Sequence, residues 1–355
     1  MTSRIRLDRY VYEDIYPAFK AATDEKEITA ALNRNFLNFL AERNLVLAGD
    51  SPVAVADIGC GPCDTLIKYL TGVLFPPGFV VRATDYIDRY ADSERGDAVR
   101  TLTAARSNKV INLAEFSARA GNAFGGELSK LLAPPRGDAA ARRAFSLVYA
   151  SHVLYHADGL SDVRRLIADV ADNLLAADGI CILFHIANTP GTFQEFRARF
   201  GSQAGGASAS DTGAVTIDDP PAQIAVACAS MGLPLYQMEF EAKLRFGSLG
   251  NDEWRAFKDP RAYEAIAQSN GAAYEDLKRL YFVVQRAPAE FATDDSATGL
   301  KTFLDDIRQV IESNRGALPL AERIQVFTRA DTSLPGETIA DALAAGVSAD
   351  DRLRS

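Results

Sequence analysis

The sequence predicts an α/β fold, a doubly wound and mostly parallel sheet of seven strands. Two observations carry this prediction. Between residues 49 and 190, short apolar runs of strand length alternate with stretches whose apolar residues recur at helical spacing. The runs are apolar along their whole length, which is typical of strands buried on both faces. An alternation of this kind places helices on both sides of a parallel sheet.

The predicted elements follow in chain order. Residues 4–44 have the apolar spacing of a helical lead-in. Strands are predicted at residues 52–59, 79–85, 109–113, 144–150, 179–186, 235–246 and 323–329. Helices are predicted at residues 64–74, 160–177 and 221–231, with two or more within 251–315. Residues 121–143 and 201–219 are rich in small and turn-forming residues and are predicted to be surface loops.

The chain is expected to have four segments. Residues 1–48 form a helical N-terminal lid, 49–190 a Rossmann-like ligand-binding core, 191–330 the rest of the sheet with cap helices, and 331–355 a loose polar tail. Ligands bind outside the carboxyl ends of the strands in a parallel sheet, and the N-terminal segment can fold over that opening.

Composition excludes several classes of protein. The 355 residues include 38 Lys and Arg against 47 Asp and Glu, a net charge of -9, which disfavours binding to nucleic acid. No apolar run approaches the ~20 residues that cross a membrane. The N-terminus lacks the apolar core of a signal peptide, and four cysteines in this length do not form a secreted disulfide framework. We therefore expect a cytoplasmic protein that binds a small molecule, and the sequence leaves open a homodimer.

The segment Asp57-Ile58-Gly59-Cys60-Gly61-Pro62-Cys63 lies between the first predicted strand and the next helix. Glycines at such a turn let the backbone approach a ligand closely. Asp85 ends the second strand, where a carboxylate can accept hydrogen bonds from both ribose hydroxyls. The turn and the acid together predict an adenosine-type ligand.

Three other interpretations of this region are weaker. Cys60-Gly61-Pro62-Cys63 also has the dithiol spacing of thioredoxin-like oxidoreductases, but such domains are short and lack the long strand and helix alternation that follows here. No second Cys pair or Cys/His cluster completes a zinc site, and we expect no metal. The dehydrogenase pattern Gly-x-Gly-x-x-Gly is incomplete because Asp64 replaces its last glycine.

The turn resembles the first motif of the class I S-adenosylmethionine-dependent methyltransferases, close to Asp-x-Gly-x-Gly-x-Gly. Asp57, Gly59 and Gly61 match it, whereas Cys63 stands at the third glycine, which normally serves close packing of the helix. Asp85 matches the ribose-binding acid, and residues 145–156 and 174–182 match the fourth strand and the helix, turn and strand that follow. The resemblance implies S-adenosylmethionine as cofactor, bound by Asp57, Gly59, Cys60, Gly61, Asp85, Tyr86 and Ser151.

A narrower likeness is to the histamine N-methyltransferase-like small-molecule enzymes. It lies in Tyr10-Val11-Tyr12-Glu13, in Val153-Leu154-Tyr155-His156 and in residues 191–201. In that group aromatic side chains and an N-terminal glutamate enclose a small nitrogenous substrate; either Glu25 or Glu27 can take the acidic part here. The resemblance implies a substrate site formed by Tyr10, Tyr12, Tyr16, Glu25, Tyr155, Phe193 and Phe196. The tyrosines of the lead-in can equally pack against helices.

The chemistry needs few groups. Methyl transfer from a sulfonium is an in-line displacement, so catalysis is mostly positioning, and aromatic faces tolerate positive charge. A protonated amine must first lose a proton, for which His152 or His156 is the candidate base beside Tyr155; a thioether needs no base. We expect a methyltransferase acting on nitrogen or thioether sulfur of a small polar metabolite. A non-catalytic S-adenosylmethionine- or nucleotide-binding protein, and an O-methyltransferase of a small phenolic compound, are the alternatives.

Overall fold

The computed structural model describes residues 12–46, 50–74, 77–92, 95–132, 145–196, 219–247, 265–268, 271–284 and 297–351. The chain forms two compact units, each assembled from three stretches. We call the first the helical unit (Met1–Glu25, Asn188–Ser208 and Glu241–Ala321) and the second the sheet unit (Lys26–Ala187, Ala209–Phe240 and Glu322–Ser355). The four consecutive segments expected from the sequence stay a prediction.

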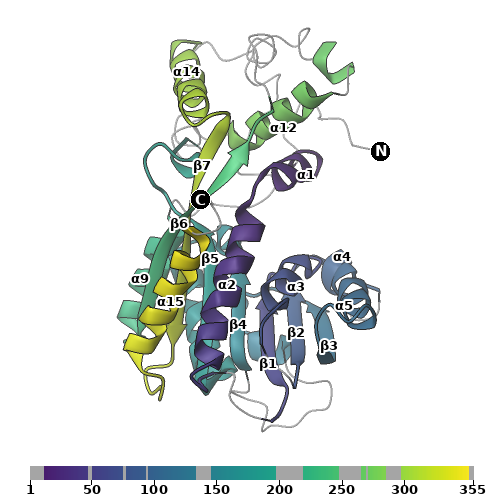
Figure 1. Cartoon of the computed structure of the whole chain (residues 1–355), viewed down its shortest axis with the longest axis vertical. Helices are drawn as coiled ribbons and strands as arrows, with labels where there is room; N and C mark the ends of the chain where they lie inside the picture. Colours follow the sequence, from purple (N-terminus) through teal and green to yellow (C-terminus); the bar gives the residue numbers. More distant parts are fainter. Residues whose placement is uncertain are drawn as a thin grey trace. The chain divides into compact units, whose positions relative to one another are not determined.

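A seven-stranded sheet organises the sheet unit (Figure 1). Its strands are β1 (Val53–Ile58), β2 (Phe79–Asp85), β3 (Leu113–Ala120), β4 (Phe145–Ser151), β5 (Leu175–Ile186), β6 (Leu235–Arg245) and β7 (Ala317–Thr328). They lie in the order β3-β2-β1-β4-β5-β7-β6. Strands β1 to β5 pair in parallel and β7 runs antiparallel to β5, so the predicted doubly wound, mostly parallel sheet is confirmed.

Helices cover both faces of this sheet. One face packs against α2 (Glu25–Ala41), α3 (Asp64–Leu70), α5 (Asp97–Ser107) and α15 (Gly336–Asp351). The other packs against α6 (Leu128–Leu131), α7 (Leu160–Asp169) and α9 (Pro220–Ser230). Along β1 the alternation is direct, since Val55 joins the first cluster and Ala56 and Ile58 the second. The short α4 (Asp88–Ala91), the 3-10 turn η2 (Leu154–His156) and the π-helical turn η3 (Val170–Leu174) complete the described connections of this unit.

Two predictions for this unit were wrong. The third strand begins at Leu113, where residues 109–113 were expected to be the strand. It is an edge strand with mostly half-buried or exposed residues, so it lacks the apolar run that marks the central strands. Residues 331–355 were expected to be a loose tail, but α15 lies within them and buries Ile339, Ala342 and Leu343 against the sheet. Its alanine-rich sequence conceals a narrow apolar stripe.

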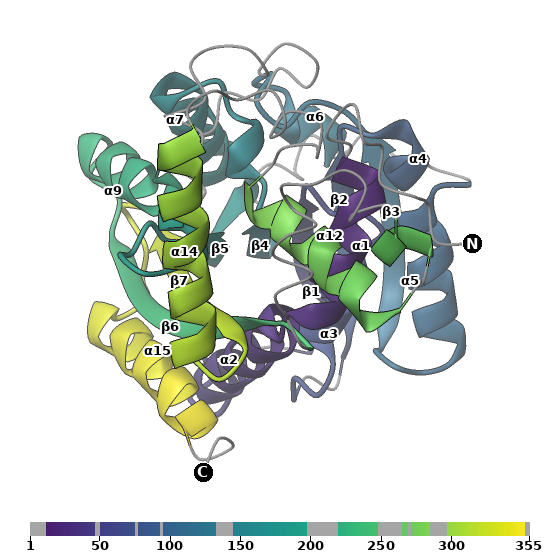
Figure 2. The ribbon, with the colours of Figure 1, turned by 90° about the horizontal axis from the view of Figure 1, so that it is seen from above.

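The helical unit contains α1 (Tyr12–Ala22), α12 (Ala272–Val284) and α14 (Ala297–Ser313), and α1 packs against α12. Figure 2 shows these helices from above. Four aromatic rings form the centre of this contact: Phe19 and Phe282 stack with centroids 4.2 Å apart, and Tyr16 and Phe193 pack on the same pair. Residues 23 and 24 are tied to the distal half of β6, because Asp24 accepts a hydrogen bond from the Lys243 backbone at 2.7 Å.

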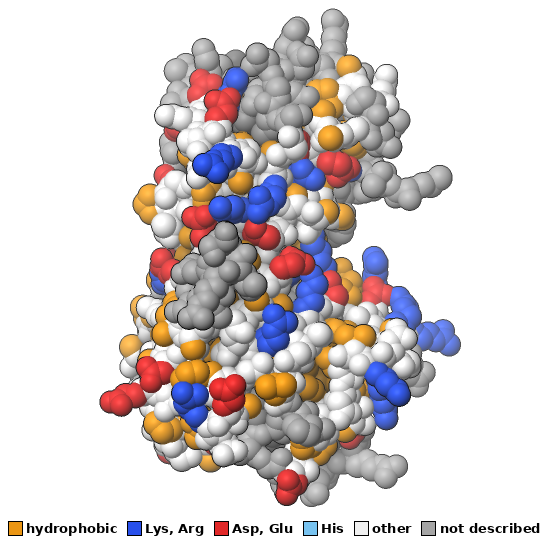
Figure 3. Space-filling view, in the orientation of Figure 1, with side chains coloured by type: hydrophobic (Ala, Val, Ile, Leu, Met, Phe, Trp, Pro, Cys, Tyr) orange, Lys and Arg blue, Asp and Glu red, His pale blue; other side chains and the backbone are white. Residues whose placement is uncertain are grey.

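The described surface mixes charges of both signs. On the face seen in Figure 3, Lys and Arg side chains stand among Asp and Glu side chains. None of the helices in the described ranges combines the length and the apolar character that a membrane crossing requires.

Candidate functional site

The turn between β1 and α3 is held in a conformation that few residues other than glycine adopt. Gly59 and Gly61 have φ angles of 70° and 49°. A Cβ atom on Gly59 would lie 2.7 Å from Cγ2 of Val153, whereas Gly61 has open space where its Cβ would be. The backbone N–H groups of Gly59 and Cys60 both donate to the carbonyl of Thr84, at 2.8 and 3.0 Å. The turn is therefore fastened to the end of β2.

Asp85 binds the turn directly. Its Oδ2 accepts a hydrogen bond from Gly61 N at 2.8 Å, and its Oδ1 accepts one from Ile87 N at 2.9 Å. The predicted ribose-binding carboxylate and the predicted glycine turn thus lie side by side at the carboxyl ends of β1 and β2. Each carboxylate oxygen has a further lone pair, so Asp85 can accept hydrogen bonds from ligand hydroxyls as well.

Asp57 is buried at this edge beside two other acidic residues, Asp64 and Asp85. It is 6% exposed. Its pKa is raised to about 8, chiefly by burial and further by the charges of Asp85 and Asp64, while Lys26 acts in the opposite direction. A carboxyl group with a pKa this high holds its proton near neutral pH, and a cation bound beside it would lower the pKa and favour the carboxylate. The site therefore favours a ligand that combines hydroxyl groups with positive charge.

The two cysteines of the turn are buried and reduced. The thiols are hydrogen-bonded to each other, which lowers the pKa of Cys60 and raises that of Cys63; burial raises both, and each ends above its usual value. Thioredoxin-like chemistry needs the opposite, an accessible thiol of low pKa. Cys63 has a φ of 60°, so the position of the missing third glycine is one where glycine's backbone freedom is useful. Sequence reasoning had assigned that glycine to helix packing alone.

A buried polar network lies behind the end of β4. Tyr69 Oη and Ser151 Oγ are 3.1 Å apart. Tyr149 donates to Asn33 Oδ1 at 3.1 Å, and Asn33 donates to the carbonyl of Tyr69 at 3.0 Å. These contacts join α2, α3 and β4, and they fix Ser151 at the same edge of the sheet as the glycine turn.

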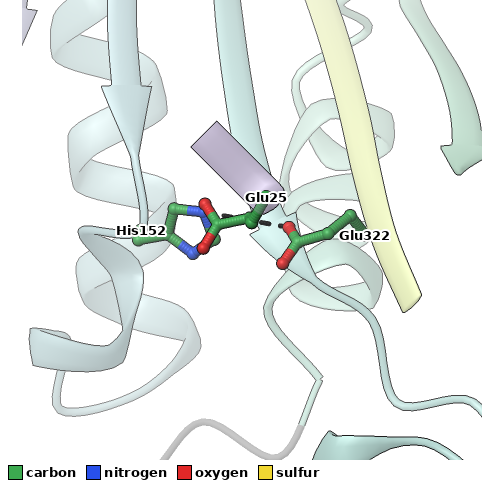
Figure 4. Close-up of side chains that lie close together, drawn as sticks. All are labelled: Glu25, His152 and Glu322. Atoms are coloured by element: carbon green, nitrogen blue, oxygen red, sulfur yellow. Dashed lines mark ion pairs between the residues drawn. The ribbon is translucent and has the colours of Figure 1, made fainter. Parts of the chain in front are cut away.

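His152 follows Ser151 in the left-handed region, with a φ of 55°, and its N–H donates to the Phe184 carbonyl on β5 at 2.9 Å. Its Nε2 lies 3.8 Å from Oε2 of Glu322, which is 0% exposed on β7 (Figure 4). Glu322 is opposite Ile186, the last residue of β5, so the antiparallel strand delivers its side chain to the ligand-binding edge. Sequence reasoning missed Glu322, because the apolar pattern of its strand marks only core positions.

Glu25 joins the same group. It is the first residue of α2, is 3% exposed, and has a carboxylate oxygen within 4.8 Å of ligand atoms of both His152 and Glu322 (Figure 4). Glu27, the other candidate acid, is exposed and pairs with Lys68 at 2.6 Å. The structure thus brings together two residues singled out by sequence, Glu25 and His152, with one that was not.

The other two histidines differ in their surroundings. His156 packs edge-on against Tyr86, with ring centroids 4.8 Å apart, and burial lowers its pKa although Asp85 raises it. His185 lies within β5, 6.1 Å from the His152 ring, and its pKa is well below the usual value because of burial, His152 and Lys26. His156 therefore belongs to the Asp85 side of the edge, and His185 stays neutral.

The aromatic residues assigned to the substrate are only partly described. Phe193 and Phe196 are 0% and 2% exposed, and Phe193 packs into the aromatic centre of the helical unit with Tyr16. Tyr10, and the side chains of Tyr12 and Tyr155, lie outside the described residues. The role of all these residues in substrate binding, and the role of residues 1–48 as a lid, stay predictions.

Several solved structures are similar to this chain at low sequence identity. The YcgJ protein from Bacillus subtilis is 14% identical over 82% of this chain and 98% of that one, with a TM-score of 0.41. A putative sarcosine dimethylglycine methyltransferase from Galdieria sulphuraria is 11% identical over 82% and 83%, with a TM-score of 0.40. A geranyl diphosphate C-methyltransferase from Streptomyces coelicolor, crystallised with Mg²⁺, geranyl-S-thiolodiphosphate and S-adenosyl-L-homocysteine, is 12% identical over 81% and 73%, with a TM-score of 0.38.

No protein-family model and no curated protein matches the chain. The fold rests on the strand order itself, which is that of a Rossmann-like sheet with one antiparallel strand. The functional conclusion has to come from the site's own residues.

Proposed function

We propose that this protein is an S-adenosylmethionine-dependent methyltransferase that acts on nitrogen or thioether sulfur of a small polar metabolite. One observation carries the proposal: Asp85 accepts a hydrogen bond from Gly61 at the carboxyl ends of β1 and β2. A glycine turn and an acid in this arrangement suit a nucleoside whose ribose hydroxyls meet the carboxylate and whose remaining part follows the turn.

The electrostatics support a sulfonium nucleoside over a dinucleotide. The negative charges of Asp85 and Asp64 raise the pKa of Asp57 at this edge. A pyrophosphate would meet repulsion from these charges, whereas the sulfonium and ammonium groups of S-adenosylmethionine would be attracted and would favour the ionised form of Asp57. When bound, this cofactor supplies an activated methyl group.

The chain's own residues then have limited tasks. Asp85 and the turn hold the nucleoside, and Asp57 faces the cationic part. Ser151 and His152, at the end of β4, border the space that an acceptor would enter. Positioning of this kind is the main source of rate in an in-line displacement.

Calorimetric titration tests the cofactor. S-adenosylhomocysteine is expected to bind the wild type, and NADH is expected to give no heat. Asp85→Ala should weaken S-adenosylhomocysteine binding about 10- to 100-fold through loss of about 1–3 kcal/mol of charge-assisted hydrogen bonds. Asp88→Ala, an exposed acid in the first turn of α4, is the matched control and should bind as the wild type does. If Asp85→Ala binds S-adenosylhomocysteine as tightly as the wild type does, the assignment of Asp85 to the cofactor site is wrong.

A second measurement tests catalysis. The protein is incubated with methyl-labelled S-adenosylmethionine and a panel of amines, amino acids, thioethers and phenols, and transferred label is measured. Transfer to an amine or a thioether supports the proposal. Binding of S-adenosylhomocysteine without transfer to any compound favours a cofactor-binding protein without this activity.

A further inference from the structure

The environment of His152 contains more acid than the cofactor requires. Within the part of the chain that the structure describes, Glu322 on β7, Glu25 at the start of α2 and His185 on β5 lie beside it, and the charge of Lys26 acts on His185. His185 is neutral near neutral pH because its pKa is well below the usual value. Two carboxyl groups, those of Glu25 and Glu322, thus lie within 4.8 Å of a ring nitrogen of His152, and negative charge placed there attracts a cation.

The position of the group ties it to the acceptor. His152 directly follows Ser151 at the carboxyl end of β4, and Glu322 is opposite the last residue of β5. Ligands of a parallel sheet bind beyond these strand ends. By contrast His156, the other candidate base, packs on Tyr86 beside Asp85 and so belongs with the nucleoside.

The two side chains also suit proton transfer. At 3.8 Å, Nε2 of His152 and Oε2 of Glu322 are too far apart for a direct hydrogen bond but close enough for strong attraction once the imidazole is charged. A buried carboxylate facing an imidazole favours its protonated form. Glu322 is 0% exposed, so solvent screens this attraction little.

We infer that His152 and Glu322 form a proton-accepting pair, and that the methyl acceptor is an amine that arrives as an ammonium ion. This inference rests on the proposed function and narrows it from nitrogen or sulfur to nitrogen. Glu322, which acts through His152, is a positioning residue.

The step balances as follows. The ammonium group gives one proton to an imidazole nitrogen of His152, and the resulting imidazolium faces Glu322. The freed nitrogen lone pair forms a bond to the methyl carbon, while the carbon–sulfur bond breaks and its electron pair stays on sulfur. The products are the methylated ammonium, S-adenosylhomocysteine and one proton on His152. A thioether has no proton to release, so its methylation would not need the His152–Glu322 pair.

The test compares Glu322→Gln with the wild type in kcat/KM from pH 5.5 to 9.5, using histamine, putrescine, ethanolamine and glycine as amines. Methionine and dimethyl sulfide serve as thioethers, and mass fragmentation identifies the methylated atom. We expect wild-type transfer to an amine nitrogen. In Glu322→Gln the rate on that amine should fall about 10- to 100-fold at pH 7, and the acid limb of the profile should move down by about one pH unit.

The direction of that shift follows from the charge. The base must be neutral to accept a proton, and loss of a neighbouring carboxylate makes the imidazole less basic, so the neutral form persists to lower pH. Glu322→Asp should keep the wild-type limb because it keeps the charge. His152→Gln should lose at least about 100-fold on the same amine.

Controls separate this inference from the proposed function. Glu239→Gln removes a carboxylate that pairs with Arg323, the residue beside Glu322, and should leave the profile unchanged. Every variant is first titrated with S-adenosylhomocysteine; if the wild type does not bind it, the proposed function itself fails. If a variant at Glu322 does not bind, His152→Gln and the wild-type acceptor class decide the outcome.

Three results would overturn the inference while leaving a methyltransferase in place. The first is transfer to sulfur or oxygen only, with no amine accepted. The second is a Glu322→Gln profile whose acid limb coincides with that of the wild type. The third is loss of activity after dialysis against EDTA with recovery on adding Zn²⁺ or Mn²⁺, which would make Glu25, His152 and Glu322 a metal site.

Discussion

The glycine turn and the His152–Glu322 pair lie at the same edge of one sheet, yet the chain builds them in opposite ways. The turn consists of consecutive residues, and two neighbouring residues at the end of β2, Thr84 and Asp85, fasten it. The pair joins the end of β4 to a strand far along the chain that returns antiparallel beside β5. Local geometry therefore creates the first feature, and the sheet topology creates the second.

The difference is also one of energetics. The turn is constrained by backbone conformation, with three residues at positive φ within five positions, Gly59, Gly61 and Cys63. The pair is constrained by burial of charge, with a wholly buried carboxylate facing an imidazole. Changes of side-chain size should therefore damage the turn most, and changes of charge or pH should damage the pair most.

The largest expected effect comes from Gly59→Ala. The new Cβ would lie 2.7 Å from Cγ2 of Val153, and the φ of 70° is costly for alanine. We expect the free energy of unfolding to fall by about 2–4 kcal/mol, measured by urea denaturation. Gly61→Ala meets no neighbour at its Cβ and should cost only the backbone part, about 1–2 kcal/mol.

A double variant sharpens this result, because Val153 stands between the turn and η2. Val153→Ala in the Gly59→Ala background should recover part of the loss, giving a cost smaller than the sum of the two single changes. Additive costs would mean that the turn and the end of β4 do not touch in the way described.

The sequence alone predicts the glycine turn but not the His152–Glu322 pair, for a physical reason. The turn is encoded by consecutive residues: the apolar run of β1 predicts a strand, and Asp57, Gly59 and Gly61 at its end predict a glycine turn. The central strands β1, β2 and β4 can also be predicted from the sequence, because strands buried on both faces have continuous apolar runs. Glu322 carries no such signal, since a buried acid inside an apolar strand is meaningful only when its neighbour in space is known.

The same reasoning explains the two errors in the fold. Strand β3 is stabilised by pairing with β2 at the edge of the sheet. Its polar residues face solvent, so the sequence has no apolar run there that predicts a strand. Helix α15 is recognised only when Ile339 and Leu343 are seen against the sheet. Both elements depend on tertiary contacts that local patterns do not contain.

An intermediate effect is expected from pH. The folded state raises the pKa of Asp57 to about 8, whereas the unfolded chain has a value near the ordinary one, about 4. The native state therefore holds the Asp57 proton more tightly than the unfolded chain does. The contribution of this proton to the free energy of unfolding is fully present below about pH 4 and is lost as the pH rises toward 8. Asp57→Asn has no proton to lose, so ligand-free Asp57→Asn should be more stable than the wild type at pH 9, by about 1–3 kcal/mol.

Thermal unfolding at pH 5, 7 and 9 measures this prediction. The difference between Asp57→Asn and the wild type should grow with pH. At pH 9, where Asp57 of the wild type is anionic, S-adenosylhomocysteine should bind the variant more weakly because the anionic partner of its ammonium group is gone. A difference that shrinks as pH rises would contradict the electrostatic picture of the acidic edge.

The smallest expected effect separates two explanations of the departure at Cys63. If the position needs backbone freedom, Cys63→Gly relieves a strained φ of 60° and loses a small buried side chain, so its stability should stay within about 1 kcal/mol of the wild type. Cys63→Ala keeps the strained backbone and also loses the sulfur, so it should be about 1 kcal/mol less stable than Cys63→Gly in urea denaturation. If the position instead serves helix packing, the order reverses, because the alanine Cβ still fills the buried space beside α3.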